Sequence, residues 1–116
     1  MIDGVEFLRA DSVQQEAEKL EGMDYVLVRA DRAGVYVGYL EEENGDTVVL
    51  RDCRWIWYWS GASSIFEIAN KGVSDPDGCK FPAPIKRAKI SGVITILPVT
   101  EEAKTSIEQV QVWTQH

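Results

Sequence analysis

The sequence predicts an α+β fold in which a small, mainly antiparallel sheet of four to five strands packs against an N-terminal helix, a short middle helix and a C-terminal helix. Two observations support this prediction. Short runs of β-branched and aromatic residues are separated by turn signals, above all Asn44-Gly45, a typical two-residue hairpin turn. Helix-capping signals precede three short segments whose apolar residues have helical spacing. Consecutive strands usually pair, so we expect them to form one antiparallel sheet. We expect the helices to pack on one side of that sheet.

The first expected helix spans residues 11–21. Asp11 or Ser12 supplies the N-cap, Gln15 stands at capping-box spacing from Ser12, and Gly22 supplies a left-handed stop. Such a short helix is not stable alone. We therefore expect it to dock on the sheet or on another subunit.

The strands are predicted from runs of strand-forming residues and from the turns between them. Asp31 to Gly34 is the first turn, and Asn44-Gly45 joins the second strand to a long third one. The expected strands are 25–29, 35–41, 47–59 and 88–97.

Two further helices are expected at 64–71 and 100–108. Ser64 and Glu67 form a capping box, and Thr100 precedes an acidic first turn. The loop at 73–84 contains three prolines. A loop of this length in a small domain is more often functional or interfacial than idle.

Composition indicates one ligand-binding domain over residues 1–116. The net charge of −7 disfavours duplex nucleic acid as a partner, because the phosphate backbone repels an acidic surface. The N-terminal residues lack the basic start and apolar core of a signal peptide, and no apolar run is long enough for a membrane helix. We expect a cytoplasmic protein without membrane association, whose two cysteines are reduced thiols.

The sequence offers little for catalysis. Its single histidine is the terminal His116, so a Ser-His-Asp or Cys-His arrangement is excluded unless the tail folds back. Asp75 to Gly78 superficially resembles a calcium loop but lacks the downstream glutamate, and no P-loop spacing is present. We expect no enzymatic activity, no cofactor and no metal site.

The segment from Arg51 to Gly61 is the most unusual part of the chain. If it is one strand, Trp55, Trp57 and Trp59 share a face. They are then either core and dimer contacts, or a platform on which nucleobases stack.

Basic side chains are the second candidate binding feature. Arg29 ends an apolar strand and Arg54 interrupts one, so both are expected to be partly buried and to meet a carboxylate, a carbonyl or a ligand anion. Lys80 joins this basic set, whereas Arg32 and Lys86 fit an ordinary solvated surface.

Four segments carry a resemblance to a known family: Val-Arg-Ala-Asp-Arg-Ala-Gly-Val at 28–35, Arg-Trp-Ile-Trp-Tyr-Trp-Ser-Gly-Ala at 54–62, Cys-Lys-Phe-Pro at 79–82 and Val-Ile-Thr-Ile-Leu-Pro-Val-Thr at 93–100. On these segments the chain resembles the phage-encoded Thoeris anti-defence sponges. Proteins of that family bind cyclic ADP-ribose isomers made by bacterial TIR enzymes and withhold them from their effector without cleavage. They also bind cyclic oligonucleotide signals at separate sites and assemble as dimers or larger oligomers.

The resemblance implies a role for three residues. Arg29 would contact phosphate, Phe81 would stack on a base, and Arg54 would be a candidate for a second phosphate site. The sequence departs from the family pattern at Ala30, Trp55 and Val99, where Thr, Arg and Cys are expected.

We therefore expect a phage anti-defence protein that sequesters a cyclic nucleotide inside the infected bacterial cell and forms at least a homodimer. The alternative is an acidic phage protein that inhibits a host protein by direct contact, with the tryptophan face as its contact patch. The candidate ligand-binding residues are Arg29, Phe81, Arg54, Trp57, Trp59 and Lys80.

Overall fold

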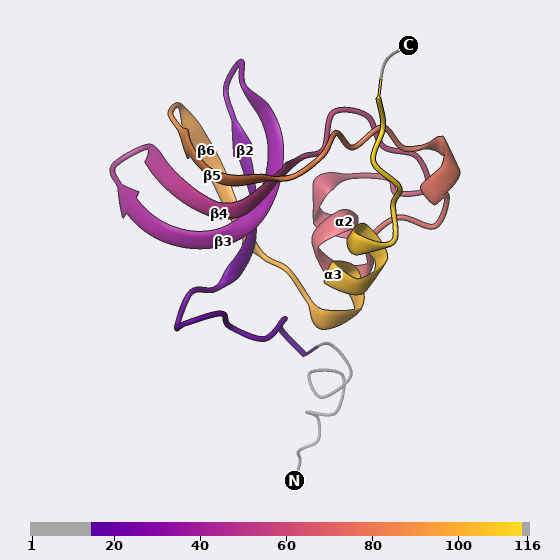
Figure 1. The fold of residues 1–116 in the computed structure, drawn as a ribbon, viewed down its shortest axis with the longest axis horizontal. Helices are drawn as coiled ribbons and strands as arrows, with labels where there is room; N and C mark the ends of the chain where they lie inside the picture. Colours follow the sequence, from indigo (N-terminus) through magenta and orange to yellow (C-terminus); the bar gives the residue numbers. More distant parts are fainter. Residues whose placement is uncertain (1–14, 115–116) are drawn as a thin grey trace, which may run out of the picture.

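The computed structural model describes residues 15–114 and shows an antiparallel sheet flanked on one side by helices (Figure 1). The five strands are β2 (Tyr25–Ala30), β3 (Gly34–Asn44), β4 (Thr47–Trp55), β5 (Ile85–Ile90) and β6 (Val93–Pro98). The helices are α2 (Ile65–Lys71), the 3-10 turn η1 (Pro76–Gly78) and α3 (Glu101–Glu108). The expected α+β class, the antiparallel sheet and the middle and C-terminal helices are confirmed.

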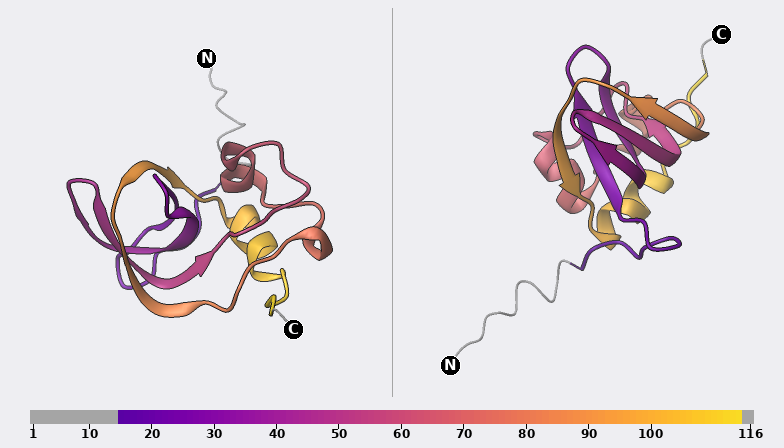
Figure 2. Two further views of the ribbon diagram at one scale, coloured as in Figure 1. Left: turned by 90° about the horizontal axis from the view of Figure 1, so that it is seen from above. Right: turned by 90° about the vertical axis from the view of Figure 1, so that its left-hand side faces the viewer.

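The sheet is strongly curled. Its strand order is β5-β4-β3-β2-β6, yet only Ser91 and Gly92 separate β5 from β6 along the chain. Strands at opposite edges can be joined by so short a link only if the two edges converge, and the view from above shows this curl (Figure 2). Gly92 has a φ of 78°, which favours glycine, and its carbonyl accepts a hydrogen bond from Asp31 N at 2.8 Å.

Two cores lie on the two faces of this sheet. One lies inside the curl and includes side chains from all five strands, among them Val28, Leu50 and Ile90. The other fills the space between the sheet and the helices, and includes Leu27 of β2 and Ile107 of α3. Because β2 is covered on both faces, its sequence is a continuous apolar run rather than an alternation.

The two helices begin where their caps predict. Ser64 Oγ accepts the backbone N–H of Glu67 at 3.3 Å, and Thr100 Oγ1 accepts that of Ala103 at 3.0 Å. The carboxylate of Glu67 accepts from Ser63 N and Ser63 Oγ rather than from Ser64. Gly72 closes α2.

The prediction of an N-terminal helix at 11–21 is wrong for residues 15–21, and residues 11–14 lie outside the described part of the chain. Residues 15–18 instead run beside the segment that precedes α3, with Ala17 N donating to Val99 O at 2.9 Å. Glu21 and Gly22, at φ values of 52° and 82°, form a two-residue turn. Gly22 thus provides a turn and not a helix stop.

Two strand predictions also need correction. The expected strand 47–59 leaves the sheet after Trp55, and Tyr58 then pairs with Lys80 outside it. The expected strand 88–97 is two strands, since Gly92 breaks it and β5 begins earlier, at Ile85. Within residues 15–114 no helix is long and apolar enough to cross a membrane.

Candidate functional site

Three of the five arginines within residues 15–114 are occupied by other groups of the protein. Arg51 Nε and Arg87 Nε both donate to Glu41 Oε1, at 3.1 and 3.0 Å. These two arginines hold the pKa of the Glu41 carboxyl below its usual value. Neither guanidinium is therefore free to hold a ligand anion without first giving up this carboxylate.

Arg54 is buried and serves the protein backbone. Its side chain is 8% exposed. Its guanidinium donates to four carbonyl oxygens: Phe81 O at 3.3 Å, Pro82 O at 3.2 Å, Ile107 O at 3.0 Å and Val110 O at 2.7 Å. Burial lowers the pKa of Arg54, yet a guanidinium stays charged in proteins. The carbonyls at the C-terminus of α3 compensate this charge, since that end of a helix is negative.

Arg29 and Arg32 form the remaining pair. Within residues 15–114 neither guanidinium has a hydrogen-bonded or carboxylate partner. Both side chains are exposed, and both line a hollow of about 320 Å³. We call it the arginine hollow; its lining residues are Arg29, Ala30, Arg32, Gly34, Val35, Trp59 and Ile65.

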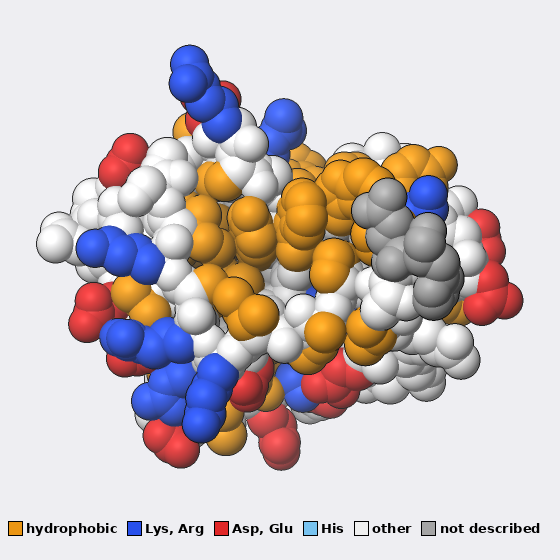
Figure 3. Space-filling model, turned by 45° about the horizontal axis from the view of Figure 1, so that its top comes forward, with side chains coloured by type: hydrophobic (Ala, Val, Ile, Leu, Met, Phe, Trp, Pro, Cys, Tyr) orange, Lys and Arg blue, Asp and Glu red, His pale blue; other side chains and the backbone are white. Residues whose placement is uncertain are grey.

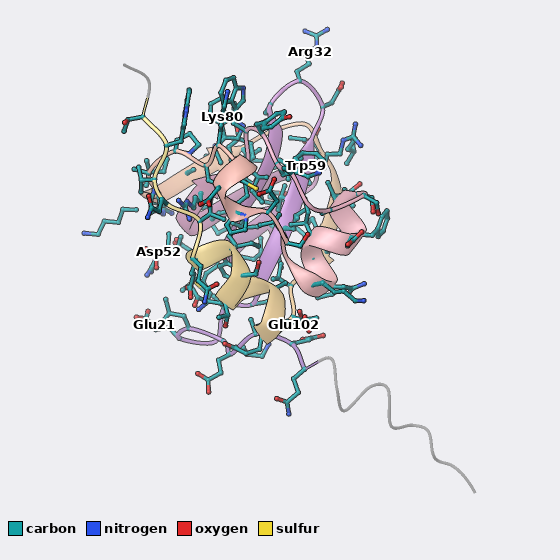
Figure 4. The ribbon with its side chains drawn as sticks, turned by 90° about the vertical axis from the view of Figure 1, so that its right-hand side faces the viewer. Glu21, Arg32, Asp52, Trp59, Lys80 and Glu102 are labelled. Carbon is teal, nitrogen blue, oxygen red and sulfur yellow. The ribbon has the colours of Figure 1, made fainter. Side chains whose placement is uncertain are left out.

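Local structure explains why these residues meet. Tyr25 and Leu27 face the helices from β2, so Arg29 follows them on the same face at the end of the strand. Arg32 lies in the β2–β3 turn with a φ of 72°, and Tyr36 Oη braces this turn by donating to Ala33 O at 2.8 Å. Figure 4 shows Arg32 at the tip of this turn, at the opposite end of the molecule from Glu21 and Glu102.

The three neighbouring tryptophans do not share one face. Trp59 is partly buried, packs against the core under the helices and lines the arginine hollow. Trp55 and Trp57 instead are exposed and belong to an aromatic row with the half-buried Tyr36 and Trp113. The ring centroids from Tyr36 through Trp55 and Trp57 to Trp113 are 6.4, 6.0 and 4.8 Å apart. The expectation that the three side chains share one face of a strand is wrong because β4 ends at Trp55.

Lys80 lies on the aromatic row. Its Nζ is 5.6 Å from the ring of Trp57 and 5.7 Å from that of Trp113, and it also lies 5.7 Å from the ring of Tyr58. These are cation–π distances. The structure therefore brings Lys80 and Trp57 together, and groups Trp59 with Arg29 instead.

Phe81 has no exposed surface. Its ring belongs to the core between sheet and helices, with the Arg54 guanidinium 5.4 Å from its centroid. A ring buried on both faces has no face on which a base can stack. The structure thus favours the alternative in which Phe81 fills the core beneath the loop, and we leave it out of the site proposed below.

Sequence reasoning missed several residues of these sites, among them Tyr36, Arg32 and Trp113. Arg32 is exposed, as the sequence predicts, but it also lines the arginine hollow, and its place in the turn after Arg29 is the sequence signal for this. Trp113 follows the last helix at the far end of the chain, and its pairing with Trp57 depends on the contact of Trp113 N with Phe81 O at 3.0 Å. No local sequence pattern indicates a contact between residues so far apart along the chain.

The described residues offer binding groups more readily than reactive ones. Within residues 15–114 no three His, Cys, Asp or Glu side chains lie close enough together to hold a metal ion. Burial raises the pKa of Cys53 to about 12, so this thiol is a poor nucleophile at neutral pH. Ser60 Oγ donates to Asp75 Oδ2 at 2.9 Å, with no histidine in the described chain to act as a base.

Comparison with known proteins identifies the family. No curated protein and no solved structure matches the chain with statistical significance. A family model described as a domain of unknown function, DUF6948, matches residues 23–107. This match runs from β2 to the last turn of α3 and covers the whole sheet. The chain therefore belongs to the DUF6948 family.

Proposed function

We propose that this protein is a phage anti-defence protein that binds a cyclic nucleotide immune signal at the arginine hollow and holds it without cleaving it. One observation carries the proposal. Of the five arginines in the described chain, Arg29 and Arg32 have no partner, and they lie beside the indole of Trp59.

The chemistry of the hollow suits a nucleotide. A guanidinium binds two phosphate oxygens through parallel N–H donors, so two adjacent guanidinium groups match a pyrophosphate. An indole offers a π-face to a purine, and such stacking contributes about 1 to 3 kcal/mol per base. The volume of about 320 Å³ lies at the lower end of small-molecule pockets.

The resemblance to the Thoeris anti-defence sponges narrows the ligand to a cyclic ADP-ribose isomer, with cyclic oligonucleotides as further ligands at other sites. Arg29 is the residue that both arguments share, because the resemblance implies a phosphate contact there. Sequestration requires tight binding and slow release. A second copy of the chain closing over the open hollow would provide this.

The test is capture followed by release. The full chain is incubated with cyclic ADP-ribose, freed of unbound ligand and heated, and the released nucleotide is analysed by mass spectrometry. A sponge returns the nucleotide intact, an enzyme returns product, and a protein-contact inhibitor returns nothing. The last two results each contradict the proposal.

Arg29→Ala should weaken capture about 10- to 150-fold, because a hydrogen bond to a charged ligand is worth about 1.5 to 3 kcal/mol. The matched control is Lys89→Ala, which removes one positive charge from β5, on the other side of β3 and β4 from β2. Titration calorimetry of both variants gives the comparison. Equal affinities with unchanged melting temperatures would remove Arg29 from the site.

The aromatic row supports a homo-oligomer, at least a dimer. Figure 3 shows apolar side chains in a broad band across one face, and the indole of Trp57 is 45% exposed. A monomer seldom leaves so broad an apolar surface in water. We expect sedimentation at tens of micromolar protein to show a dimer or larger species. Ordinary protein–protein interfaces are largely associated at about this concentration.

Trp57→Glu places a charge in the proposed interface and should shift the protein toward monomer, whereas Ile94→Glu, on the exposed surface of edge strand β6, should not. A wild-type monomer at these concentrations would contradict the oligomer. The same aromatic row also favours the second candidate function, inhibition of a host protein by direct contact, which predicts no nucleotide capture at all.

A further inference from the structure

A second hollow, of about 460 Å³, lies beneath the C-terminal end of α3. We call it the Tyr25 hollow. It shares no lining residue with the arginine hollow. Its lining residues are Leu20, Tyr25, Tyr39, Asp52, Arg54, Pro84, Ile107, Glu108, Val110 and Val112. Most of these side chains are apolar or aromatic, as in pockets that bind small organic molecules.

The hydroxyl of Tyr25 is the feature that points to a ligand. The side chain is only 7% exposed, yet no residue of the described chain forms a hydrogen bond with its hydroxyl group. Burial is the main cause that raises the pKa of this hydroxyl, and the negative charge of Glu108 raises the pKa further. The hydroxyl therefore stays protonated at neutral pH. Tyr25 and Glu108 both line the hollow, which places the Tyr25 side chain in its wall. A buried hydroxyl without a partner costs free energy, which a ligand oxygen would recover.

The charges around the hollow disfavour ions of either sign. Asp52 and Glu108 line it with carboxylates, which would repel a phosphate or a carboxylate ligand. Arg54 lines it as well, and Lys104 bonds Glu108 Oε2 at 2.9 Å with its Nζ 5.5 Å from the ring of Tyr25. The two negative and two positive charges balance, so neither an anion nor a cation meets a net opposite charge that would offset the loss of its hydration.

We propose that the Tyr25 hollow binds a small, uncharged, predominantly apolar molecule whose hydroxyl or carbonyl oxygen pairs with the Tyr25 hydroxyl. The rings of Tyr25 and Tyr39, edge to face at 5.0 Å between centroids, form its aromatic wall. This site is independent of nucleotide capture. It survives the failure of that proposal, because the two hollows have no residue in common.

Three isosteric probes test the proposal on the full chain: benzamide is neutral, benzoate is an anion and benzamidine is a cation. Ligand-observed and protein-observed NMR titrations measure their affinities. We expect benzamide to bind most tightly and to shift signals of residues that line the hollow. Tighter binding of benzoate or benzamidine, or no saturable binding of any probe, would overturn the proposal.

Tyr25→Phe should weaken benzamide binding about 2- to 10-fold, the change expected for one neutral hydrogen bond. Its melting temperature should stay the same or rise, because the variant removes a buried hydroxyl that has no hydrogen-bond partner among residues 15–114. Tyr58→Phe removes an exposed hydroxyl elsewhere and is the matched control. Val112→Trp replaces a lining residue with a much larger side chain that fills the hollow, and should therefore abolish benzamide binding. An unchanged benzamide affinity in Tyr25→Phe, or a clear drop in its melting temperature, would assign the hydroxyl a structural role instead.

Discussion

Arg54→Leu should lower the free energy of unfolding by about 3 to 5 kcal/mol, because several buried carbonyl oxygens lose their donor and each unpaired acceptor costs about 1 to 3 kcal/mol. The wild-type guanidinium donates to the carbonyls of Phe81, Pro82, Ile107 and Val110. Leucine fills part of the volume but leaves these acceptors without a donor, and each buried acceptor left unpaired is costly. The free energy of unfolding of a typical domain is only about 5 to 15 kcal/mol, so the variant approaches the limit below which the chain does not fold.

Chemical denaturation measures this effect, with Arg51→Leu as the matched control. Arg51 lies on the same strand but pairs with Glu41 near the surface, where an ion pair contributes about 0 to 1 kcal/mol. Similar midpoints for the two variants would show that Arg54 does not hold α3 and the 79–84 loop together. Arg54→Lys should fall between them, because one ammonium cannot reach four carbonyls arranged around a guanidinium.

Phe81→Ala should also destabilise the protein, by about 3 to 5 kcal/mol, since its ring has no exposed surface and a large buried side chain is lost. Thermal melting and cyclic ADP-ribose binding are measured on the same samples. We expect a large drop in melting temperature, with affinity kept in the fraction that remains folded. An unchanged melting temperature with lost affinity would restore the stacking role that the family resemblance implies.

Features of the fold that depend on local chemistry were predictable. Ser64 and Thr100 set the starts of α2 and α3 through single side-chain bonds to nearby backbone, which a sequence displays directly. The segment at 15–21 was not predictable in this way. Its capping box and glycine favoured a helix, but its backbone pairs with Val99 and Glu101, about 80 residues away along the chain. Tertiary pairing overrode a short helix that has little stability of its own.

The candidate site was also predictable only where local sequence determines it. Arg29 and Trp59 were both predicted as binding residues, since an arginine ending an apolar strand and a tryptophan-rich segment are visible in the sequence. The sequence does not show which arginines are already occupied. Arg54 interrupts an apolar strand just as a ligand-binding arginine would. Only the positions of the 79–84 loop and of the C-terminal end of α3 reveal that four carbonyls accept its hydrogen bonds.

The link of only Ser91 and Gly92 between strands at opposite edges has a consequence for synthesis. β2 pairs with β3 as soon as both have left the ribosome, but its other edge pairs with β6, whose residues Val93–Pro98 emerge last among the strands. Until then β2 presents an unpaired, strongly apolar edge, which is a template for aggregation. Long-range closure of this kind also slows folding. The interval in which this protein is prone to aggregate is therefore set by how quickly its last strand is made and reaches β2.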